Sequence, residues 1–480
     1  MENTLVLYPA PGIGHMISML ELAKLILRHY SNKFSRIHIL INTGFRDMKS
    51  TYLDHISSTN PSIVVHQFPF IQADLSSSLS PPAIGFKFIR KNAPNVHHAL
   101  QEISKTSSIR ALIIDFFCTS AMPYSNNLGI PVYYFFTSGA AAVALFLYFP
   151  TIHKQTSESF KDLVQTKFDV PGLPPIPATQ MPEPVLDRDD PAYDDILYYS
   201  VHLPKSSGII VNTFDELEPI ALKAITDGLC VPDAPTPPLY NIGPLIADAD
   251  SRPAIDGDKG IDLDQSDCFS WLDRQPDQCV VFLCFGSRGT FSVEQIKEIA
   301  KGLERSGKRF LWVVKKPLRN NKSKQVEGSG GFEIDSILPE RFLEKTKGIG
   351  LVVKSWIPQL QVLRHPAVGG FVTHCGWNST LEAVVAGVPL VAWPLHAEQH
   401  VNMAALVQDM KMAIPVEQGD DGIVRGEEVE KRVRELMDSE RGRELRKLSQ
   451  KTRDIAAESG VHLGSSSTAL ASLIHVVFGN

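Results

Sequence analysis

Residues 356–399 read WIPQLQVLRHPAVGGFVTHCGWNSTLEAVVAGVPLVAWPLHAEQ. The apolar run GGFVT predicts a strand, HCGWNS a turn, and TLEAVVAG a helix. Asn378 or Ser379 would be a suitable N-cap for this helix. The N–H groups at its first turn, with their partial positive charge, suit a diphosphate. On physical grounds two interpretations stay open: a nucleotide site, or an ordinary strand–turn–helix unit with aromatic packing.

The same alternation of apolar strands and helices extends outward over the whole chain. Strands are predicted at 4–8, 36–42, 63–68, 111–115, 131–135 and 208–212, and then at 280–285, 309–314, 351–353, 370–373 and 390–392. Helices are predicted at 17–29, 292–305, 379–386, 427–437 and 465–477. Strands that alternate with helices form parallel β-α-β units. The fold class is therefore α/β, with two Rossmann-like doubly wound domains that face each other across a cleft, where ligands bind at the carboxyl ends of the strands.

Composition shifts predict the domain boundaries. We expect an N-terminal Rossmann-like domain at 1–245, an interdomain linker at 246–266, and a C-terminal Rossmann-like domain at 267–460. A C-terminal helix at 461–480 is expected to pack back on the N-terminal domain. The proline-rich and acidic stretch at 150–200 is expected to be a long connecting loop.

Charge, hydropathy and cysteine content exclude several classes of protein. The net charge is −6, with no basic run, which argues against a nucleic-acid partner. The longest apolar run, at 139–150, is shorter than the roughly 20 residues of a transmembrane helix. The N-terminus MENTLVLYPAPG lacks the basic start of a signal peptide. Six cysteines without a CxxC pair favour reduced thiols and a cytoplasmic location.

A histidine and an aspartate stand at strand ends in the first half of the chain. His15 follows the glycine turn PAPGIG after the first predicted strand, and Asp115 ends the fourth. Both should lie at the carboxyl edge of the sheet, where a histidine held by a carboxylate can act as a general base. The alternative is that His15 ends a turn by chance and Asp115 merely caps a strand end.

The segment 356–399 closely resembles the signature segment of plant family 1 UDP-glycosyltransferases. It opens with W-x-P-Q, has H-C-G-W-N-S-x-x-E at its centre and closes with A-E-Q, and the likeness extends through nearly all 480 residues. The resemblance implies a GT-B fold and an inverting, single-displacement glycosyl transfer. It also implies that His15 is the base and that Asp115 orients it.

The resemblance implies that one group of side chains contacts the UDP-sugar: Ser287, Trp356, Gln359, His374, Trp377, Asn378, Ser379, Glu382, Glu398, Gln399, Thr137 and Ser138. In these proteins the residue at Trp356 stacks on uracil, and the one at Gln359 lies beside the nucleoside. Glu382 corresponds to the group that accepts from the ribose hydroxyls.

Within that group, the resemblance implies that His374, Asn378 and Ser379 bind the diphosphate, together with Ser287. Trp377, Glu398 and Gln399 would meet the sugar, and Thr137 and Ser138 would approach it from the first domain. Trp377 favours glucose over glucuronic acid, because a neutral aromatic offers no charge partner to a carboxylate, and the resemblance implies that Gln399 favours glucose over galactose. Arg288 departs from the family pattern, and it either contacts the ligands or is simply solvated.

No cofactor and no metal are implied, because UDP-glucose is a co-substrate and protein groups stabilise the leaving UDP. The sequence Asp187-Arg-Asp189 imitates a metal-binding D-x-D, but it lies in a proline-rich stretch and is better explained as a solvated loop. Gly12 and Gly14 begin a dinucleotide fingerprint, but Ile17 stands at the third glycine position, which disfavours NAD.

The candidate walls of the acceptor site are apolar and aromatic: Phe86, Phe117, Phe136, Met181 and Tyr193. The alternative is that most of them belong to the core. Residues 118–141 and 202–219 resemble the branch that acts on flavonoids, chalcones and dihydrochalcones. The predicted partners are a phenolic acceptor and a UDP-sugar, with neither nucleic acid nor a membrane span, and we expect a monomer. C-glucosylation of the same phenols and a non-catalytic UDP-sugar-binding protein stay open.

Overall fold

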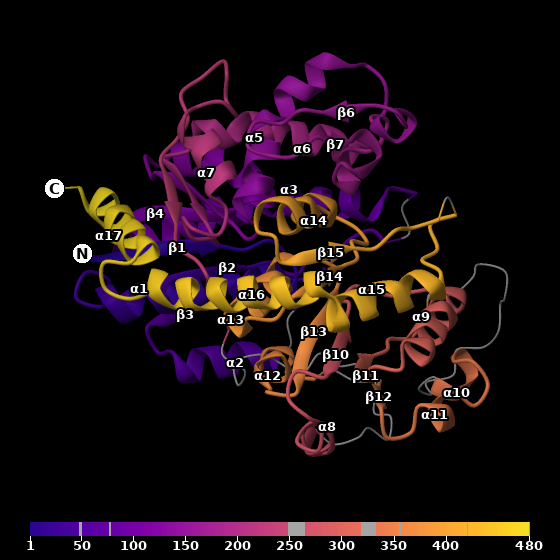
Figure 1. The fold of residues 1–480 in the computed structure, drawn as a ribbon. Helices are drawn as coiled ribbons and strands as arrows, with labels where there is room; N and C mark the ends of the chain where they lie inside the picture. The colour runs from indigo at the N-terminus through magenta and orange to yellow at the C-terminus, as the bar shows by residue number, and fades with distance from the viewer. Residues whose placement is uncertain are drawn as a thin grey trace. The chain divides into compact units, whose positions relative to one another are not determined.

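The computed structural model divides the chain into two compact units (Figure 1). Unit 1 comprises Met1–Ala247 and Ala457–Asn480, and unit 2 comprises Asp248–Ala456. The structure describes residues 1–47, 50–75, 78–247, 265–317, 333–354, 357–419 and 421–479. Most of the expected linker at 246–266 lies outside these residues, and each unit is considered by itself.

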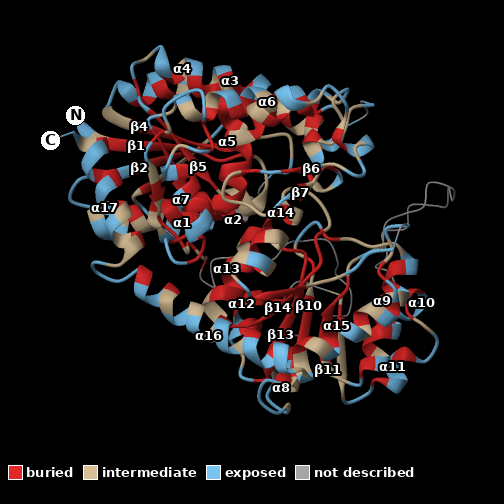
Figure 2. Ribbon diagram, turned by 45° about the horizontal axis from the view of Figure 1, so that its top comes forward, coloured by how far each residue is buried: buried red, intermediate tan, exposed pale blue. Residues whose placement is uncertain are grey.

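Unit 1 is built on a parallel sheet whose described strands follow the order β3-β2-β1-β4-β5-β8-β9. Their bounds are β1 (Glu2–Tyr8), β2 (Arg36–Ile41), β3 (Ile63–Gln67), β4 (Ser107–Asp115), β5 (Val132–Phe136), β8 (Gly208–Val211) and β9 (Leu239–Asn241). The central strands are apolar and buried over Leu5–Tyr8 of β1, Ala111–Ile114 of β4 and all of β5, because helices cover both faces of a parallel sheet. Figure 2 shows this sheet as a buried layer inside exposed helix surfaces.

The helices of unit 1 include α1 (Ile13–Tyr30), α2 (Ser50–Thr59), α3 (Pro81–Ser104), α4 (Met122–Asn126), α5 (Ala140–Gln155), α6 (Pro191–His202) and α7 (Pro219–Thr226). The apolar run at 139–150 forms most of α5, whose first eight residues are all buried. It is therefore a core helix. Among the helices that the structure describes, none has the length and apolar character needed to cross a membrane.

The prediction of one long loop at 150–200 is wrong. After α5, the chain forms short 3-10 turns, the two-stranded antiparallel pair β6 (Lys167–Phe168) and β7 (Ile176–Pro177), and then α6. The acidic stretch enters a helix because Asp190 caps its N-terminus, accepting from the Ala192 N–H at 2.8 Å, and Pro191 occupies its first turn. Proline and aspartate here signal the start of a helix.

The last helix, α17 (Ser465–Phe478), packs in the core of unit 1. Leu470, Leu473, Ile474 and Val477 belong to the same buried cluster as residues of β1, β2 and α1, and α17 itself contacts β9 and β4. The preceding helix α16 (Glu440–Ser459) contains the boundary between the units at Ala456. The expected domain boundary at 460 falls close to this point.

Unit 2 repeats the architecture, with parallel strands in the order β12-β11-β10-β13-β14-β15 among the described residues. The strands are β10 (Val280–Cys284), β11 (Arg309–Val313), β12 (Gly350–Val353), β13 (Val368–Thr373), β14 (Leu390–Ala392) and β15 (Ala413–Pro415). The helices are α8 (Gln265–Leu272), α9 (Val293–Ser306), α10 (Ile334–Ile337), α11 (Phe342–Lys345), α12 (Gln359–Arg364), α13 (Trp377–Ala386), α14 (Gln399–Ala404) and α15 (Gly426–Asp438). In both units the strand order reverses between the first and fourth strands, as expected for doubly wound sheets.

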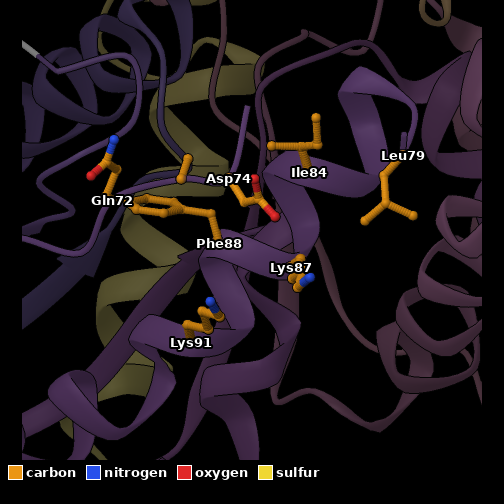
Figure 3. Close-up of a pocket in the computed structure, with 8 residues that line it drawn as sticks. Gln72, Asp74, Leu79, Ile84, Lys87, Phe88 and Lys91 are labelled. Atoms are coloured by element: carbon orange, nitrogen blue, oxygen red, sulfur yellow. The ribbon is translucent and has the colours of Figure 1, made fainter. Parts of the chain in front are cut away.

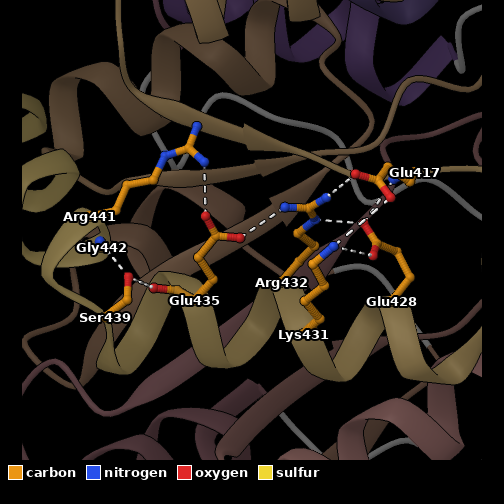
Figure 4. Close-up of polar contacts among 8 residues, drawn as sticks. All are labelled: Glu417, Glu428, Lys431, Arg432, Glu435, Ser439, Arg441 and Gly442. Atoms are coloured by element: carbon orange, nitrogen blue, oxygen red, sulfur yellow. Dashed lines mark hydrogen bonds and ion pairs between the residues drawn. The ribbon is translucent and has the colours of Figure 1, made fainter.

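An ion-pair network around the nearly buried Arg432 side chain fixes α15 in unit 2 (Figure 4). Arg432, with its side chain only 9% exposed, pairs with Glu417, Glu428 and Glu435. Glu435 also pairs with Arg441 at 2.8 Å. Several hydrogen-bonded carboxylates compensate the desolvation of one guanidinium. The network ties α15 to the segment that follows β15.

Candidate functional site

The first candidate site lies where the strand order of unit 1 reverses, between β1 and β4. Ligands of doubly wound sheets bind at such points, beyond the carboxyl ends of the strands. Gly12 follows β1 with a φ of 127°, which L side chains rarely adopt, and it is the N-cap of α1. This turn sets His15 in the first helical turn, while Asp115 is the last residue of β4.

His15 and Asp115 are in direct contact. The His15 Nδ1 lies 2.8 Å from Asp115 Oδ2, and Thr137 Oγ1 lies 3.2 Å from the same nitrogen. Asp115 is 1% exposed, whereas the His15 side chain is 31% exposed. A carboxylate can only accept, so Nδ1 carries the proton and Nε2 carries the lone pair. The arrangement can hold a general base in one tautomer.

Asp115 makes the contacts that both alternatives require. Its Oδ1 accepts from the Phe117 N–H at 3.1 Å and caps the 3-10 turn Phe116–Ala121. Its Oδ2 is the oxygen that faces His15. The cap fixes the carboxylate, and the fixed carboxylate orients the imidazole.

Of the residues predicted to line the acceptor site, Phe117 stands beside His15. Their ring centroids are 5.6 Å apart, edge to face, and Phe86 packs on Phe117 at 5.1 Å. Phe136 joins the same aromatic group through Phe116. Phe117 is half-buried, while Phe86 and Phe136 are buried.

The other two predicted acceptor residues lie in the core. Tyr193 is 1% exposed and packs against Phe149 and Phe160, and its hydroxyl bonds His153 at 2.9 Å. Met181 is 2% exposed. The core interpretation therefore describes both of them better than the acceptor one.

Residues 84–89, around Phe86, divide between two faces of α3. Ile84, Lys87, Phe88 and Lys91, at helical spacing, line a small pocket with Gln72, Asp74 and Leu79 (Figure 3). Its cavity of about 10 Å³ has room for roughly one water molecule. The pocket cannot hold a phenolic ring, and within this stretch Phe86 is the residue that packs on Phe117.

The turn after β5 is occupied by protein groups. A buried carboxylate, that of Glu218, accepts from the Ala140 and Ala141 N–H groups at 2.8 and 2.9 Å, at the N-terminus of α5. An anion site of this kind suits a phosphate, but here the protein supplies the anion. Thr137 faces His15 and Ser138 is buried. The turn therefore supports the base more directly than it supports a diphosphate.

The second candidate site lies at the equivalent point of unit 2, between β10 and β13. Gly286 follows β10 with a φ of 68°, and His374 follows β13. A Cβ on Gly286 or on Gly376 would lie 2.4 Å from His374 Nε2. The ring is therefore held between two glycine turns that no larger residue fits.

His374 is neutral at physiological pH. Burial, with His396 and Lys315 nearby, lowers the pKa of His374 from 6.5 to about 3. A neutral imidazole can donate one hydrogen bond to an anion without a net charge. Its electrostatics are therefore unlike those of a proton-transfer group.

The helix α13 starts at Trp377, two residues earlier than the predicted start at 379. Its N-cap is Gly376, with no side-chain cap, so the prediction that Asn378 or Ser379 caps it is wrong. Ser379 Oγ instead accepts from Gln359 Nε2 at 2.9 Å, and the same nitrogen donates to Glu382 Oε2 at 2.8 Å. Three of the residues predicted to contact the UDP-sugar thus form one buried hydrogen-bond network.

Gln399 is buried, and most of its amide is used within its own loop. Its Oε1 accepts from the Leu395 and His396 N–H groups at 2.9 and 3.0 Å, and its Nε2 donates to His396 Nδ1 at 2.7 Å. Glu398 is the half-buried N-cap of α14. Gln399 therefore holds the loop at 395–399 in shape, in addition to any contact that it makes with a ligand.

The other residues predicted to contact the UDP-sugar differ in solvent exposure. Trp377 is 3% exposed and Asn378 is half-buried in the first turn of α13. Ser287 and Arg288 are both exposed after Gly286. Trp356 lies outside the described residues.

Sequence reasoning missed two polar residues that hold the glycine turns. Lys315, which follows β11, donates to the Gly286 carbonyl, and burial lowers the pKa of its amino group. Asn402, on α14 and 0% exposed, donates to the Cys375 carbonyl at 2.9 Å. The sequence did contain a sign of Asn402: it is a polar residue on the buried side of a short helix.

The Asp187-Arg-Asp189 stretch is held by protein contacts. Asp187 pairs with Lys161 at 2.5 Å and accepts from the Asp189 N–H at 3.1 Å. Across the described ranges, there is no cluster of three or more His, Cys, Asp or Glu side chains suited to a metal ion.

Comparison with known proteins gives concordant matches. The family model for UDP-glucoronosyl and UDP-glucosyl transferase matches residues 255–454. UDP-glycosyltransferase 88F3 of Pyrus communis is 55% identical over 482 residues, covering 99% of both chains. Phloretin 2'-O-glucosyltransferase of Malus domestica is 54% identical over 484 residues, again with 99% of both chains covered.

The similarity extends to solved structures. A Medicago truncatula glycosyltransferase complexed with UDP-glucose superposes with a TM-score of 0.85 at 32% identity. The match covers 100% of this chain and 99% of that one.

Proposed function

Because this chain belongs to the UDP-glycosyltransferase family, we propose that it transfers glucose from UDP-glucose to a phenolic hydroxyl, with His15 as the base. The fold is GT-B, as predicted, and the protein is a glycosyltransferase. The observation that carries the catalytic assignment is the 2.8 Å contact between His15 Nδ1 and Asp115 Oδ2.

In the proposed mechanism, the phenol binds with its hydroxyl at His15 Nε2. As the phenol oxygen attacks the anomeric carbon, its proton passes to Nε2, and the bond from that carbon to the diphosphate breaks. The imidazolium that forms is stabilised by the buried carboxylate of Asp115. UDP leaves with the bonding electron pair, and the single displacement inverts the anomeric centre to give a β-glucoside.

We assign the donor to unit 2. The N-terminus of α13 offers N–H groups to the diphosphate, and neutral His374 can donate to it without taking up a proton. Glu382 has a second oxygen besides the one that accepts from Gln359, and it is the group proposed to accept from the ribose. Trp377 and Gln399 are proposed to favour glucose.

We infer that the acceptor is a flavonoid, chalcone or dihydrochalcone. Two facts support this class: the similarity to a phloretin 2'-O-glucosyltransferase, and the aromatic group of Phe86, Phe117 and Phe136 next to the base. A flat, apolar polyphenol can stack on such rings and leave one hydroxyl at His15.

The test is incubation of the protein with UDP-glucose and a panel of dihydrochalcones, chalcones, flavonoids and simple phenols. Mass spectrometry should find hexosides of the polyphenols, together with released UDP, and a β-glucosidase should remove the sugar. A product that resists the glucosidase would indicate a bond to carbon. UDP-glucose binding without UDP release would contradict the proposed function.

A further inference from the structure

The turn between β13 and α13 is strained. Cys375 has a φ of 63°, in the left-handed region, although it is not a glycine. L side chains rarely adopt this region, because Cβ comes too close to the following carbonyl oxygen. Cys375 is fully buried, so the surrounding structure must hold the turn in place.

The group that holds it is Asn402. Its Nδ2 donates to the Cys375 carbonyl at 2.9 Å, and it reaches Glu398 Oε1 only at 3.4 Å. The helix that carries Asn402 begins at Gln399, and its N-cap is Glu398. Asn402 is 0% exposed, so a change at this position acts through protein contacts and not through solvent.

The Cys375 carbonyl and the Gly376 N–H belong to one planar peptide unit and point in opposite directions. Fixing the carbonyl therefore fixes the direction of the Gly376 N–H. Gly376 is the N-cap of α13, and a Cβ added to it would clash with His374, so the same peptide sets the first helical turn and one side of the imidazole.

We propose that Asn402 is a positioning residue for the donor diphosphate: it keeps the Cys375–Gly376 peptide in the orientation that aims the N-terminus of α13 and His374 at the anion. The inference rests on the proposed donor site. Asn402 does not itself touch the ligand. Its effect passes through the Cys375–Gly376 peptide, so it changes the binding of the UDP part of the donor and not the contacts to the sugar.

The experiment compares Asn402→Leu, which fills the same volume without a donor, with the unmodified protein. We expect the Kd for UDP and the KM for UDP-glucose to rise together by about 10-fold, because a buried carbonyl loses its partner and the turn relaxes. The KM for the phenol should stay unchanged. If Asn402→Leu does not fold, Asn402→Asp keeps the shape and should show the same loss at neutral pH.

A second substitution separates positioning from packing. Glycine adopts a positive φ without steric cost, so Cys375→Gly should restore most of the UDP affinity of Asn402→Leu. Cys375→Gly alone provides the reference for the double variant. A packing defect would persist in the double variant, and that result would overturn the proposal.

The matched control is Gln295→Leu. Gln295 is another buried amide of unit 2, and it binds the backbone of Val424 through both its oxygen and its nitrogen. This variant should lower Tm and leave the UDP affinity intact.

Unchanged UDP affinity in Asn402→Leu would refute the inference, as would a loss confined to UDP-glucose, which would point to Glu398 and the sugar. If the unmodified protein failed to bind UDP at all, the proposed function would be the part that is wrong.

Discussion

The two sheets place a histidine at the same kind of position and give it opposite properties. His15 and His374 each lie where the strand order of their sheet reverses, beside a glycine turn. The His15 side chain is 31% exposed and faces a carboxylate. His374 is 8% exposed and lies between two glycines. Burial, together with the His396 imidazole and the Lys315 ammonium group, lowers its pKa to about 3.

The fold therefore supplies the position of each histidine, and the neighbouring groups supply its chemistry. A carboxylate on one nitrogen leaves the other nitrogen able to take a proton and stabilises the cation that forms. Burial without a carboxylate keeps the ring neutral, which suits an anion-binding donor. The following predictions test this contrast between a proton-transfer histidine and a neutral one.

The largest effect is expected for His15→Ala. Without a base, the phenol must lose its proton to water, and we expect kcat to fall about 1000-fold. The Kd for UDP, measured by calorimetry, should be unchanged because His15 belongs to unit 1. Loss of UDP affinity in this variant would remove the contrast between the two histidines.

Asp115→Asn should lower kcat by about 100-fold. The amide can present an N–H to His15 Nδ1, which moves the proton to Nε2 and blocks its role as a base. The amide oxygen can still accept from the Phe117 N–H, so Tm should change little. A large drop in Tm with unchanged kcat in the folded fraction would show that Asp115 acts only as a cap.

The third prediction concerns acid stability. The His374 pKa in the folded protein, about 3, lies below its unfolded value of 6.5, so the unfolded state binds more protons. The stability from neutral His374 is present above pH 6.5 and is lost as the pH falls toward 3. At pH 5.5 the loss is about 1.4 kcal/mol. The free energy of unfolding, measured in urea at several pH values, should fall less steeply with decreasing pH in His374→Gln than in the unmodified protein. The same pH dependence in both proteins would contradict the prediction.

The smallest effect is expected for Gly286→Ala, whose Cβ would displace the His374 ring. We expect the KM for UDP-glucose to rise about 10-fold, as overpacking of this kind costs roughly 1–3 kcal/mol. Gly307→Ala is the control, because Gly307 has a similar φ of 64° with nothing within 4 Å of the added atom. Both variants should lose stability, but only Gly286→Ala should lose donor affinity. Equal KM values would mean that the ring is not part of the donor site.

The sequence predicted the strands well because buried parallel strands are continuous apolar runs. The run at 390–392 matches β14, and most of the others differ by a residue or two at an end. It also placed His15 and Asp115 together, since His15 follows β1, Asp115 ends β4, and these strands are neighbours in a doubly wound sheet. Strand positions follow from local sequence patterns, and the proximity of His15 and Asp115 follows from the order of the strands, so both could be predicted.

The rest depends on contacts that no local pattern encodes. The bond between Asn402 and Cys375 joins residues 27 positions apart through a turn with a positive φ at a cysteine. Glu218 caps α5 from 78 residues away, so the anion site after β5 looked open in the sequence. The aromatic residues of the predicted acceptor site could not be sorted into core and site, because both environments select the same side chains.

The most direct test of the central claim is the dependence of kcat on the acidity of the phenol, measured for the unmodified protein and for His15→Ala. A phenol that is already ionised needs no base. We predict that His15→Ala loses about 1000-fold on ordinary phenols, and progressively less on phenols whose own pKa approaches the assay pH. An equal loss on acidic and ordinary phenols would show that His15 does not take the acceptor proton.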